Sequence, residues 1–203
     1  MNQSILEGIF KLIIENKTLP NYQAERRIDI FINYFISRII SSYLGNKTEF
    51  ICPEFPLKKQ KNNQSTKIDY LCKSENEIIF VELKTDTSSL KASQANMYLE
   101  CNWNQCLYNF KIITNSVTNK IHKKKYKTLT SVIDRLEFSS DKTTIRIIYL
   151  SPLPKENSIF AKNISIINPN KLNELQIPLY EDEGIVWEFI KALDLYIFEI
   201  KHN

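Results

Sequence analysis

Three charged side chains interrupt apolar segments in the first half of the chain, at a spacing that could support shared chemistry. Glu82 and Lys84 lie in the run 78–84, whose other residues are Ile, Phe, Val and Leu. Because alternate side chains of a β-strand point to the same face, Glu82 and Lys84 would share one. A hairpin turn around residues 75–76 would place Asp69 directly opposite Glu82, with Cβ atoms about 5 Å apart.

Two facing carboxylates repel each other unless a proton or a cation lies between them. Hard divalent cations such as Mg²⁺ favour one or two carboxylates, completed by a carbonyl and water. A nearby lysine could orient a water molecule and offset charge in a phosphorane-like transition state. The pattern therefore predicts metal-assisted hydrolysis of a phosphodiester. The alternative is an exposed hairpin with an ordinary Asp–Lys pair, because E-x-K also begins at Glu15 and Glu199.

The scarcity of glycine and histidine excludes several other chemistries. The three glycines are Gly8, Gly45 and Gly184, so no glycine-rich phosphate-binding loop can be written. With only His122 and His202, an H-E-x-x-H zinc site is impossible, and any catalytic triad would depend on one of these two residues. Catalysis is therefore expected to use carboxylates, lysines and an oxygen-bound metal.

The elements that must position these residues are helices and strands in a mixed order. Helical spacing of apolar residues and short β-branched runs distinguish the two kinds. We expect helices over 4–16, 22–43, 88–113 and 181–198, strands over 49–57, 66–73, 77–84, 144–150 and 164–167, and a polar loop over 114–127. The acidic residues 181–183 would begin the last helix, where they suit its dipole. A chain of 23.9 kDa predicts a single α/β domain spanning residues 1–203.

Asp69, followed after an apolar strand by Glu82-Leu83-Lys84, resembles the PD-(D/E)XK nuclease superfamily. The resemblance implies a restriction-endonuclease-like fold, a mixed sheet flanked by helices, with an α-β-β-β-α-β core over about 22–150 and a C-terminal elaboration over 151–203. It implies that Asp69 and Glu82 ligate Mg²⁺ or Mn²⁺ with help from the Leu83 carbonyl. Lys84 would then position or activate the attacking water. Ile68 stands where the motif has proline, a common departure in this superfamily.

Four further residues could support such a site. Glu25 continues the apolar stripe of the second helix, and members of the superfamily often bring a glutamate from that helix to the metal. Glu25 could equally be a first-turn glutamate favoured by the helix dipole. Glu54, on the first strand, is another accessory candidate. Gln94 and Tyr98 resemble the Q-x-x-x-Y element of RecB-like members, with packing of the same helix face as the alternative.

The distribution of charge favours a polyanionic partner. The net charge is +4, but residues 171–203 carry three Lys and seven Asp or Glu, so this segment sums to −4 and the remainder to +8. Lysines gain affinity by releasing counterions from phosphates. Five lysines of the expected loop could contact a nucleic-acid backbone, or form only a solvated loop: Lys120, Lys123, Lys124, Lys125 and Lys127. DNA is the favoured substrate, and cutting both strands would favour a homodimer.

The cysteines and the absence of targeting segments bear on the compartment. No uncharged apolar run approaches the roughly 18 residues of a membrane span, and no signal peptide is visible. We therefore expect a cytoplasmic protein with no membrane partner. Cys52, Cys72, Cys101 and Cys106 are interpreted as reduced, buried small hydrophobes. Cys101 and Cys106 lie five apart in an expected helix, a poor spacing for a shared metal.

The leading hypothesis is thus a metal-dependent endo- or exodeoxyribonuclease acting in repair, restriction or phage defence. An alternative is a non-catalytic nucleic-acid-binding or protein-interaction module on the same fold, because 203 residues leave little room for an added DNA-reading domain. A third hypothesis is an α/β scaffold whose polar strand residues form an ordinary ion pair.

Overall fold

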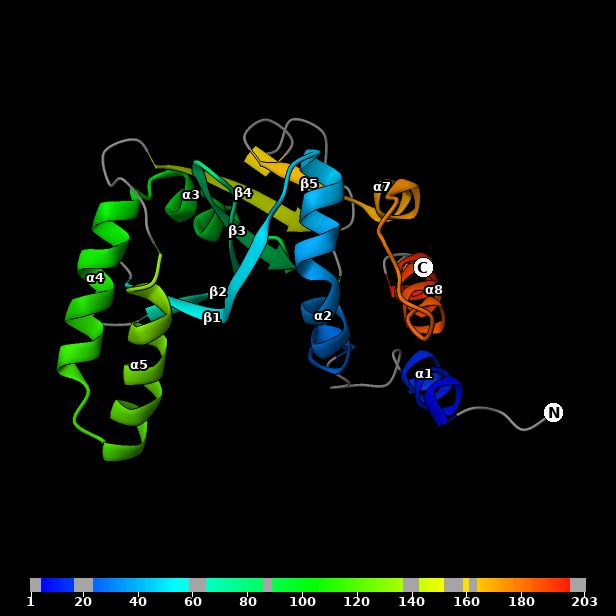
Figure 1. Cartoon of the computed structure of the whole chain (residues 1–203), viewed down its shortest axis with the longest axis horizontal. Coiled ribbons are helices and arrows are strands. Elements are labelled where there is room, and N and C mark those ends of the chain that lie inside the picture. Colours follow the sequence, from blue (N-terminus) through cyan, green and yellow to red (C-terminus); the bar gives the residue numbers. More distant parts are fainter. Residues whose placement is uncertain are drawn as a thin grey trace.

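The computed structural model describes residues 5–16, 24–58, 65–85, 89–136, 143–151, 159–160 and 164–197. Residues 4, 22–23, 88 and 198, where four of the expected helices begin or end, lie outside these ranges. Within them, a five-stranded mixed sheet carries helices on both faces, as Figure 1 shows. The expected α/β class is confirmed.

The sheet has the strand order β1-β2-β3-β4-β5. The first three strands form an antiparallel meander, while β3 runs parallel to β4 and β4 runs parallel to β5. Each strand agrees with its expected range to within one residue at either end. Their bounds are β1 Glu49–Lys58, β2 Ser65–Lys73, β3 Glu77–Leu83, β4 Thr144–Leu150 and β5 Ser165–Ile167.

Strand alternation divides the apolar core into two parts. On β3, Ile79 and Val81 belong to the part that packs against the N- and C-terminal helices, whereas Ile78 and Phe80 belong to the other. The helices of the first part are α1 (Ile5–Asn16), α2 (Ala24–Leu44), α7 (Pro169–Glu174) and α8 (Gly184–Ile197), and those of the second are α3 (Ala92–Leu99), α4 (Trp103–Ser116) and α5 (Lys120–Ile133). Among the described residues, no helix combines the length and the apolar character needed to cross a membrane.

The expected helix over 88–113 is wrong, because the structure divides this segment into α3 and α4. Asn102 adopts an extended conformation (φ −114°, ψ 137°) between the two helices. Its side chain accepts hydrogen bonds from the backbone N–H groups of Asn104 and Gln105. This is the usual arrangement at a helix N-cap. A polar residue inside an apolar helical pattern is here a start signal for a new helix.

The expected loop over 114–127 is also wrong, because α5 begins at Lys120. Asn119 caps this helix by accepting hydrogen bonds from the N–H groups of Ile121 and His122. Only a narrow apolar stripe of Tyr126, Leu129 and Ile133 packs against the core. The many lysines around this stripe conceal its helical period in the sequence.

The last helix begins at Gly184, so residues 181–183 do not form its first turn as expected. Glu183 is instead buried and bonded to α2 through Arg38. The short helix α7 was not anticipated. The Asn168 side chain caps it by accepting from the N–H of Lys171, and Pro169 occupies its first turn, a position that tolerates proline.

Candidate metal and active site

The site lies where β2 separates from β3. The two strands pair from Lys73 and Ile78 to Tyr70 and Val81, in the register expected from the sequence. Asp69 and Glu82 follow this last pair on their respective strands. Beyond this pair, the Leu83 N–H donates to the Asp69 side chain at Oδ2, at 2.9 Å, where a backbone carbonyl of the neighbouring strand would otherwise accept.

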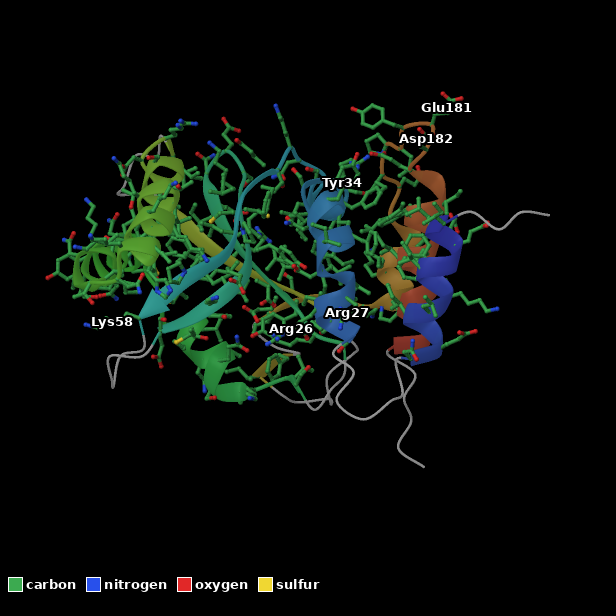
Figure 2. The ribbon with its side chains drawn as sticks, turned by 90° about the horizontal axis from the view of Figure 1, so that it is seen from below. Arg26, Arg27, Tyr34, Lys58, Glu181 and Asp182 are labelled. Atoms are coloured by element: carbon green, nitrogen blue, oxygen red, sulfur yellow. The ribbon has the colours of Figure 1, made fainter. Side chains whose placement is uncertain are left out.

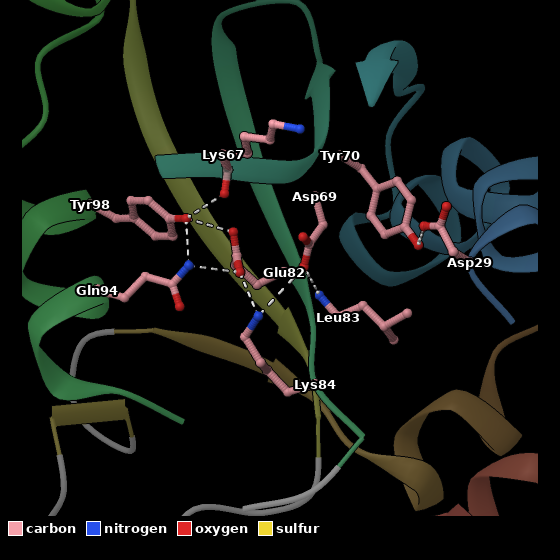
Figure 3. A network of polar contacts seen from close by, with 9 residues as sticks. All are labelled: Asp29, Lys67, Asp69, Tyr70, Glu82, Leu83, Lys84, Gln94 and Tyr98. Carbon is pink, nitrogen blue, oxygen red and sulfur yellow. Dashed lines mark hydrogen bonds and ion pairs between the residues drawn. The ribbon is translucent and has the colours of Figure 1, made fainter. Parts of the chain in front are cut away.

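Glu82 is fully buried and accepts three hydrogen bonds from side chains (Figure 3). Its Oε2 accepts from Lys84 Nζ at 2.7 Å and from Gln94 Nε2 at 3.0 Å. Its Oε1 accepts from the Tyr98 hydroxyl at 2.6 Å. A buried carboxylate is tolerated when donors satisfy it in this way. The packing alternative for Gln94 and Tyr98 is therefore incomplete, since both side chains hold Glu82.

The helix α3 brings these two donors to the sheet. Gln94 and Tyr98 lie one turn apart, and Gln94 Nε2 also donates to the Tyr98 hydroxyl oxygen at 2.8 Å. The Tyr98 ring meets Phe80 edge to face, with centroids 5.8 Å apart. The ring is thus fixed by packing while its hydroxyl is directed at Glu82, which gives the carboxylate one defined orientation.

Lys84 bridges the two acidic side chains. Its Nζ lies 2.7 Å from Glu82 Oε2 and 3.6 Å from Asp69 Oδ2, and the residue is only 8% exposed. Burial opposes the charged form, but the carboxylates of Glu82 and Asp69 outweigh it, so the pKa of Lys84 is raised. Lys84 therefore stays an ammonium at neutral pH.

The charge of Glu82 is unsettled at neutral pH. Burial raises the pKa of Glu82 to about 7, and the charge of Asp69 adds to this effect. Lys84 and the hydrogen bond from Tyr98 lower it only in part. Two carboxylates thus face a single ammonium, an arrangement that a bound cation would relieve. A buried carboxyl group whose pKa is raised by burial and by a neighbouring charge, as that of Glu82 is, is typical of functional sites.

Two acidic residues of α2 extend this region. Glu25 is half-buried in the first turn of the helix, and its negative charge contributes to raising the pKa values of Lys84 and Tyr70. Its charge therefore acts on Lys84, and its role at the site stays a prediction. Asp29, one turn further, accepts a hydrogen bond from the buried Tyr70 hydroxyl at 2.6 Å. Asp29 was not predicted from the sequence, although its i+4 spacing from Glu25 was a usable signal.

Tyr149 is a second residue of this region that was not predicted from the sequence. It is fully buried and lies beside Glu82 in the parallel register of β3 and β4. Among the described residues, its hydroxyl finds no hydrogen-bond partner. Burial, followed by the charges of Glu82 and Asp69, raises the pKa of Tyr149. In the sequence it is one more apolar position of a buried strand, so no local signal marks it.

The other expected residues lie away from this network. Glu54 is 68% exposed at its side chain, forms an ion pair with Lys67 at 2.6 Å and adopts a left-handed backbone conformation with φ of 51°. Its carboxylate is not among the groups that contact Glu82 or Lys84. The five lysines of the expected patch are exposed on α5 and belong to a helix rather than a loop: Lys120, Lys123, Lys124, Lys125 and Lys127.

The donor set suits a hard cation in part. Within the described part of the chain, Asp69 Oδ1 accepts no hydrogen bond and Glu82 Oε1 accepts only one. Those residues contain no group of three or more His, Cys, Asp and Glu side chains that could hold a metal by itself. Mg²⁺ often takes one or two carboxylates and keeps several waters. An ion here would accordingly need backbone oxygen or water beside Asp69 and Glu82.

Comparison of the chain with models of protein families, with curated proteins and with solved structures found no match.

Proposed function

We propose that this chain is a divalent-metal-dependent nuclease of the PD-(D/E)XK type, acting on DNA. The observation that carries the proposal is the convergence of Asp69, Glu82 and Lys84 where β2 leaves β3. The element order α2, β1, β2, β3, then helices and β4, is compatible with the core that this superfamily uses. Three helices stand between β3 and β4 where the core motif needs one.

Asp69 and Glu82 would hold the ion, with the Leu83 carbonyl as a third protein ligand. When bound, a divalent ion polarises a phosphoryl oxygen and lowers the pKa of a coordinated water. The ion would also remove the repulsion between the two carboxylates. Glu25 would add negative charge from α2, either directly or through water, because its charge already acts on Lys84.

Lys84 has the properties needed to act on the scissile phosphate. It is a buried ammonium between the two carboxylates. An ammonium in this position can hold a water for attack and stabilise the charge that develops on phosphate oxygens. Gln94 and Tyr98 keep Glu82 in place by hydrogen bonds, so their contribution is one of positioning.

Two arginines of α2 support a nucleic-acid substrate, because basic side chains gain affinity from phosphates. Figure 2 shows Arg26 and Arg27 on the first turn of α2, far from Glu181 and Asp182, which precede α8 in the chain. The separation of these two basic and two acidic residues supports the polyanionic partner expected from the distribution of charge in the sequence. Cutting both strands of a duplex would require two such sites, which favours a homodimer.

The exposed lysines of α5 support a second candidate function. They lie on a helix that packs against α4 and β1 rather than in the acidic network. A chain that binds nucleic acid or a protein through α5, without cleaving it, would use this surface alone. Its binding would fall with salt and would not respond to metal.

Cleavage assays on single-stranded and duplex DNA, and on RNA, separate the two functions. We expect cleavage with Mg²⁺ or Mn²⁺ and none with a chelator. Asp69→Asn and Lys84→Met should lower the rate about 100-fold or more, because each removes several kcal/mol of transition-state stabilisation. Glu77→Gln is the matched control on β3, since Glu77 pairs with Arg146 outside the site.

The control must cleave at the rate of the unchanged chain. No cleavage by any preparation, or equal cleavage by the Asp69 and Lys84 variants, would exclude the nuclease. Salt-sensitive binding that survives Lys84→Met but is lost when Lys123, Lys124 and Lys127 become Gln would establish the binding module instead.

A further inference from the structure

A surface pocket lies where β1 ends and the chain passes from α3 to α4. Its volume of about 520 Å³ is within the range of pockets that hold small ligands. Leu57 and Lys58 line it from β1, and Met97 and Glu100 line it from α3 and its C-cap. Cys101 also lies in this wall and is only partly buried, so the expectation that all four cysteines are buried is wrong for this one.

Three side-chain amides line the α4 side of the pocket: Asn102, Gln105 and Asn109. Asn102 caps α4 through its Oδ1, so the capping bonds do not use its NH₂ group. Gln105 donates from Nε2 to Asn109 Oδ1 at 3.2 Å, a bond that uses neither Gln105 Oε1 nor the second half of the Asn109 amide. The pocket therefore offers a ligand both donors and acceptors.

Two charged groups of opposite sign complete the pocket. Glu100 is exposed and supplies a carboxylate, which can accept from an amino group. Lys58, which Figure 2 shows at the end of β1, supplies an ammonium that suits a phosphate. Met97 adds apolar surface against which a flat ring can pack. A ring with polar edges, joined to a phosphate, would satisfy all of these groups, and a nucleotide has this composition.

The pocket adjoins the residues that hold Glu82. Tyr98 follows Met97 on α3, and its hydroxyl contacts both Glu82 Oε1 at 2.6 Å and the Lys67 carbonyl at 3.3 Å. Lys67 pairs with Pro56 on β1, and the next residue of β1, Leu57, already lines the pocket. A nucleic-acid strand that passes Glu82 could therefore place one of its bases in this pocket.

An exposed aromatic side chain lies beside the pocket. Tyr108 is 61% exposed on α4, three residues from Gln105. Residues three apart are neighbours on a helix surface. Exposed aromatic rings next to a basic side chain are the usual stacking surface for bases of single-stranded nucleic acid. Tyr108 thus provides a place for a second base next to the one in the pocket.

We propose that this pocket binds one unpaired base of a single-stranded DNA segment and prefers bases with an exocyclic amino group. The choice of DNA as the ligand rests on the proposed function, although binding of a base does not require cleavage. Glu100 accepts from the amino group, the amides of Asn102 and Gln105 contact neighbouring ring atoms, and Lys58 contacts a phosphate. Thymine has a carbonyl where cytosine has its amino group, so it would present an acceptor to Glu100.

The test is binding of fluorescent oligo(dC), oligo(dT) and an abasic oligonucleotide of equal length to the full chain, measured by anisotropy. A chelator in the buffer prevents metal-dependent cleavage. We expect oligo(dC) to bind about 5-fold or more tightly than oligo(dT), because one direct contact to a base edge discriminates by at least this factor. The abasic strand should bind most weakly.

Glu100→Gln tests the contact to the amino group. An amide offers a donor as well as an acceptor, so the ratio of the two affinities should fall towards one. The ratio is the decisive quantity, because removal of a negative charge raises the affinity for every strand alike. Glu181→Gln is the matched control, since it removes the same charge in the turn before α8 and should leave the ratio unchanged.

Tyr108→Ala tests the stacking surface. It should weaken oligo(dC) and oligo(dT) alike, by about 5-fold or more, and leave the abasic strand unaffected. Tyr180→Ala removes a tyrosine that is 77% exposed and lies outside the pocket, so it should change none of the three affinities. The side chains of Glu100 and Tyr108 are both exposed, and equal melting temperatures of all variants establish that the fold is intact.

Equal affinity for the three strands, or a preference for oligo(dC) that Glu100→Gln leaves intact, would overturn the proposal. The nuclease is judged separately, by cleavage with Mg²⁺. A chain that prefers oligo(dC) but does not cleave retains the pocket and loses the nuclease. A chain that cleaves but binds the three strands equally retains the nuclease and loses the pocket.

Discussion

Glu82 and Glu183 are each nearly removed from water and each lies against a cation and a tyrosine hydroxyl, yet they hold protons differently. The Glu183 carboxylate accepts hydrogen bonds from the Arg38 guanidinium at 2.5 and 3.0 Å. It also accepts from the Tyr34 hydroxyl at 2.6 Å and from the Tyr180 N–H at 2.8 Å. These hydrogen bonds, chiefly those of Arg38, lower the pKa of Glu183 to about 2. Burial instead raises the pKa of Glu82 to about 7.

The difference lies in charge balance and in the geometry of the cation. At Glu183 one guanidinium faces one carboxylate in a two-point contact, which is the strongest form of such a pair. At Glu82 one ammonium is shared between two carboxylates, and burial is complete. The first cluster is satisfied as it stands and joins α2 to the segment before α8. At the second cluster two carboxylates share one ammonium, and the proposed function depends on this imbalance of charge.

Replacing each glutamate by glutamine should give the largest difference between the two clusters, in cleavage rate and in melting temperature. Under the proposed function, Glu82→Gln should lower DNA cleavage about 100-fold or more, because a metal ligand is lost. Glu183→Gln should leave the cleavage rate of the folded chain unchanged and lower its melting temperature. The measurements are single-turnover rates and thermal unfolding of both variants. Loss of cleavage in Glu183→Gln at full folding would remove the distinction.

The pH dependence of stability should have opposite slopes at the two sites. Between about pH 4.5 and 7 the folded chain holds a proton on Glu82 that the unfolded chain has lost, so this group makes stability fall as pH rises. Between about pH 2 and 4.5 the unfolded chain holds a proton that Glu183 lacks when folded, so this group makes stability rise with pH. Urea unfolding from pH 3 to 8 measures both slopes.

Each slope has its own control variant. Glu82→Gln should remove the decline between about pH 4.5 and 7 and leave the acid limb in place. Glu183→Gln should flatten the acid limb alone. A decline that persists in Glu82→Gln would assign the raised pKa to a different group.

Tyr98 and Tyr34, the tyrosines that donate to Glu82 and Glu183, allow the effect of burial on stability to be compared. Tyr98 is 1% exposed and Tyr34 is 62% exposed, and each donates to its glutamate at 2.6 Å. Tyr98→Phe should destabilise the fold by about 1–3 kcal/mol, because Glu82 loses a donor in a buried position. Tyr34→Phe should have a smaller effect, since water can replace its hydroxyl. Chemical denaturation at pH 7 compares them, and equal losses would contradict the burial argument.

The smallest expected change in the free energy of unfolding is that of an exposed ion pair, Arg146 with Glu77. Arg146 contacts Glu77 in two places, at 2.8 and 2.9 Å, with the arginine side chain 41% exposed. Exposed pairs contribute about 0–1 kcal/mol. Arg146→Gln should therefore change the free energy of unfolding by no more than this, and less at high salt. A larger loss would show that burial is not what distinguishes the two clusters.

The hairpin that carries Asp69 and Glu82 could be predicted because its determinants are local. Alternating side chains and a short turn at residues 75–76 allow one register, and the structure has that register. The convergence of Lys84 with both carboxylates follows directly. The division of residues 88–113 into two helices also has a local determinant, the N-cap residue Asn102. It was not predicted because the apolar pattern continues on both sides of Asn102.

The contacts that could not be predicted join residues far apart in the sequence. Glu183 lies 145 residues from Arg38, so its ion pair could not be distinguished from a favourable first-turn charge of α8. The bond between Tyr70 and Asp29 is likewise produced by packing between elements, as is the lack of a partner for the Tyr149 hydroxyl among the described residues. Glu54 lies on β1 as expected, but its left-handed backbone conformation, uncommon for a glutamate, could not be predicted from the strand pattern.

The outermost strands of the sheet bear on how this protein behaves at high concentration. β1 is an edge strand that contains Pro53 and Pro56, a register shift after Phe50 and the left-handed Glu54. Prolines donate no hydrogen bond, and bulges bend an edge away from a neighbour. The opposite edge, β5, has only three residues. Both edges therefore resist strand-by-strand aggregation.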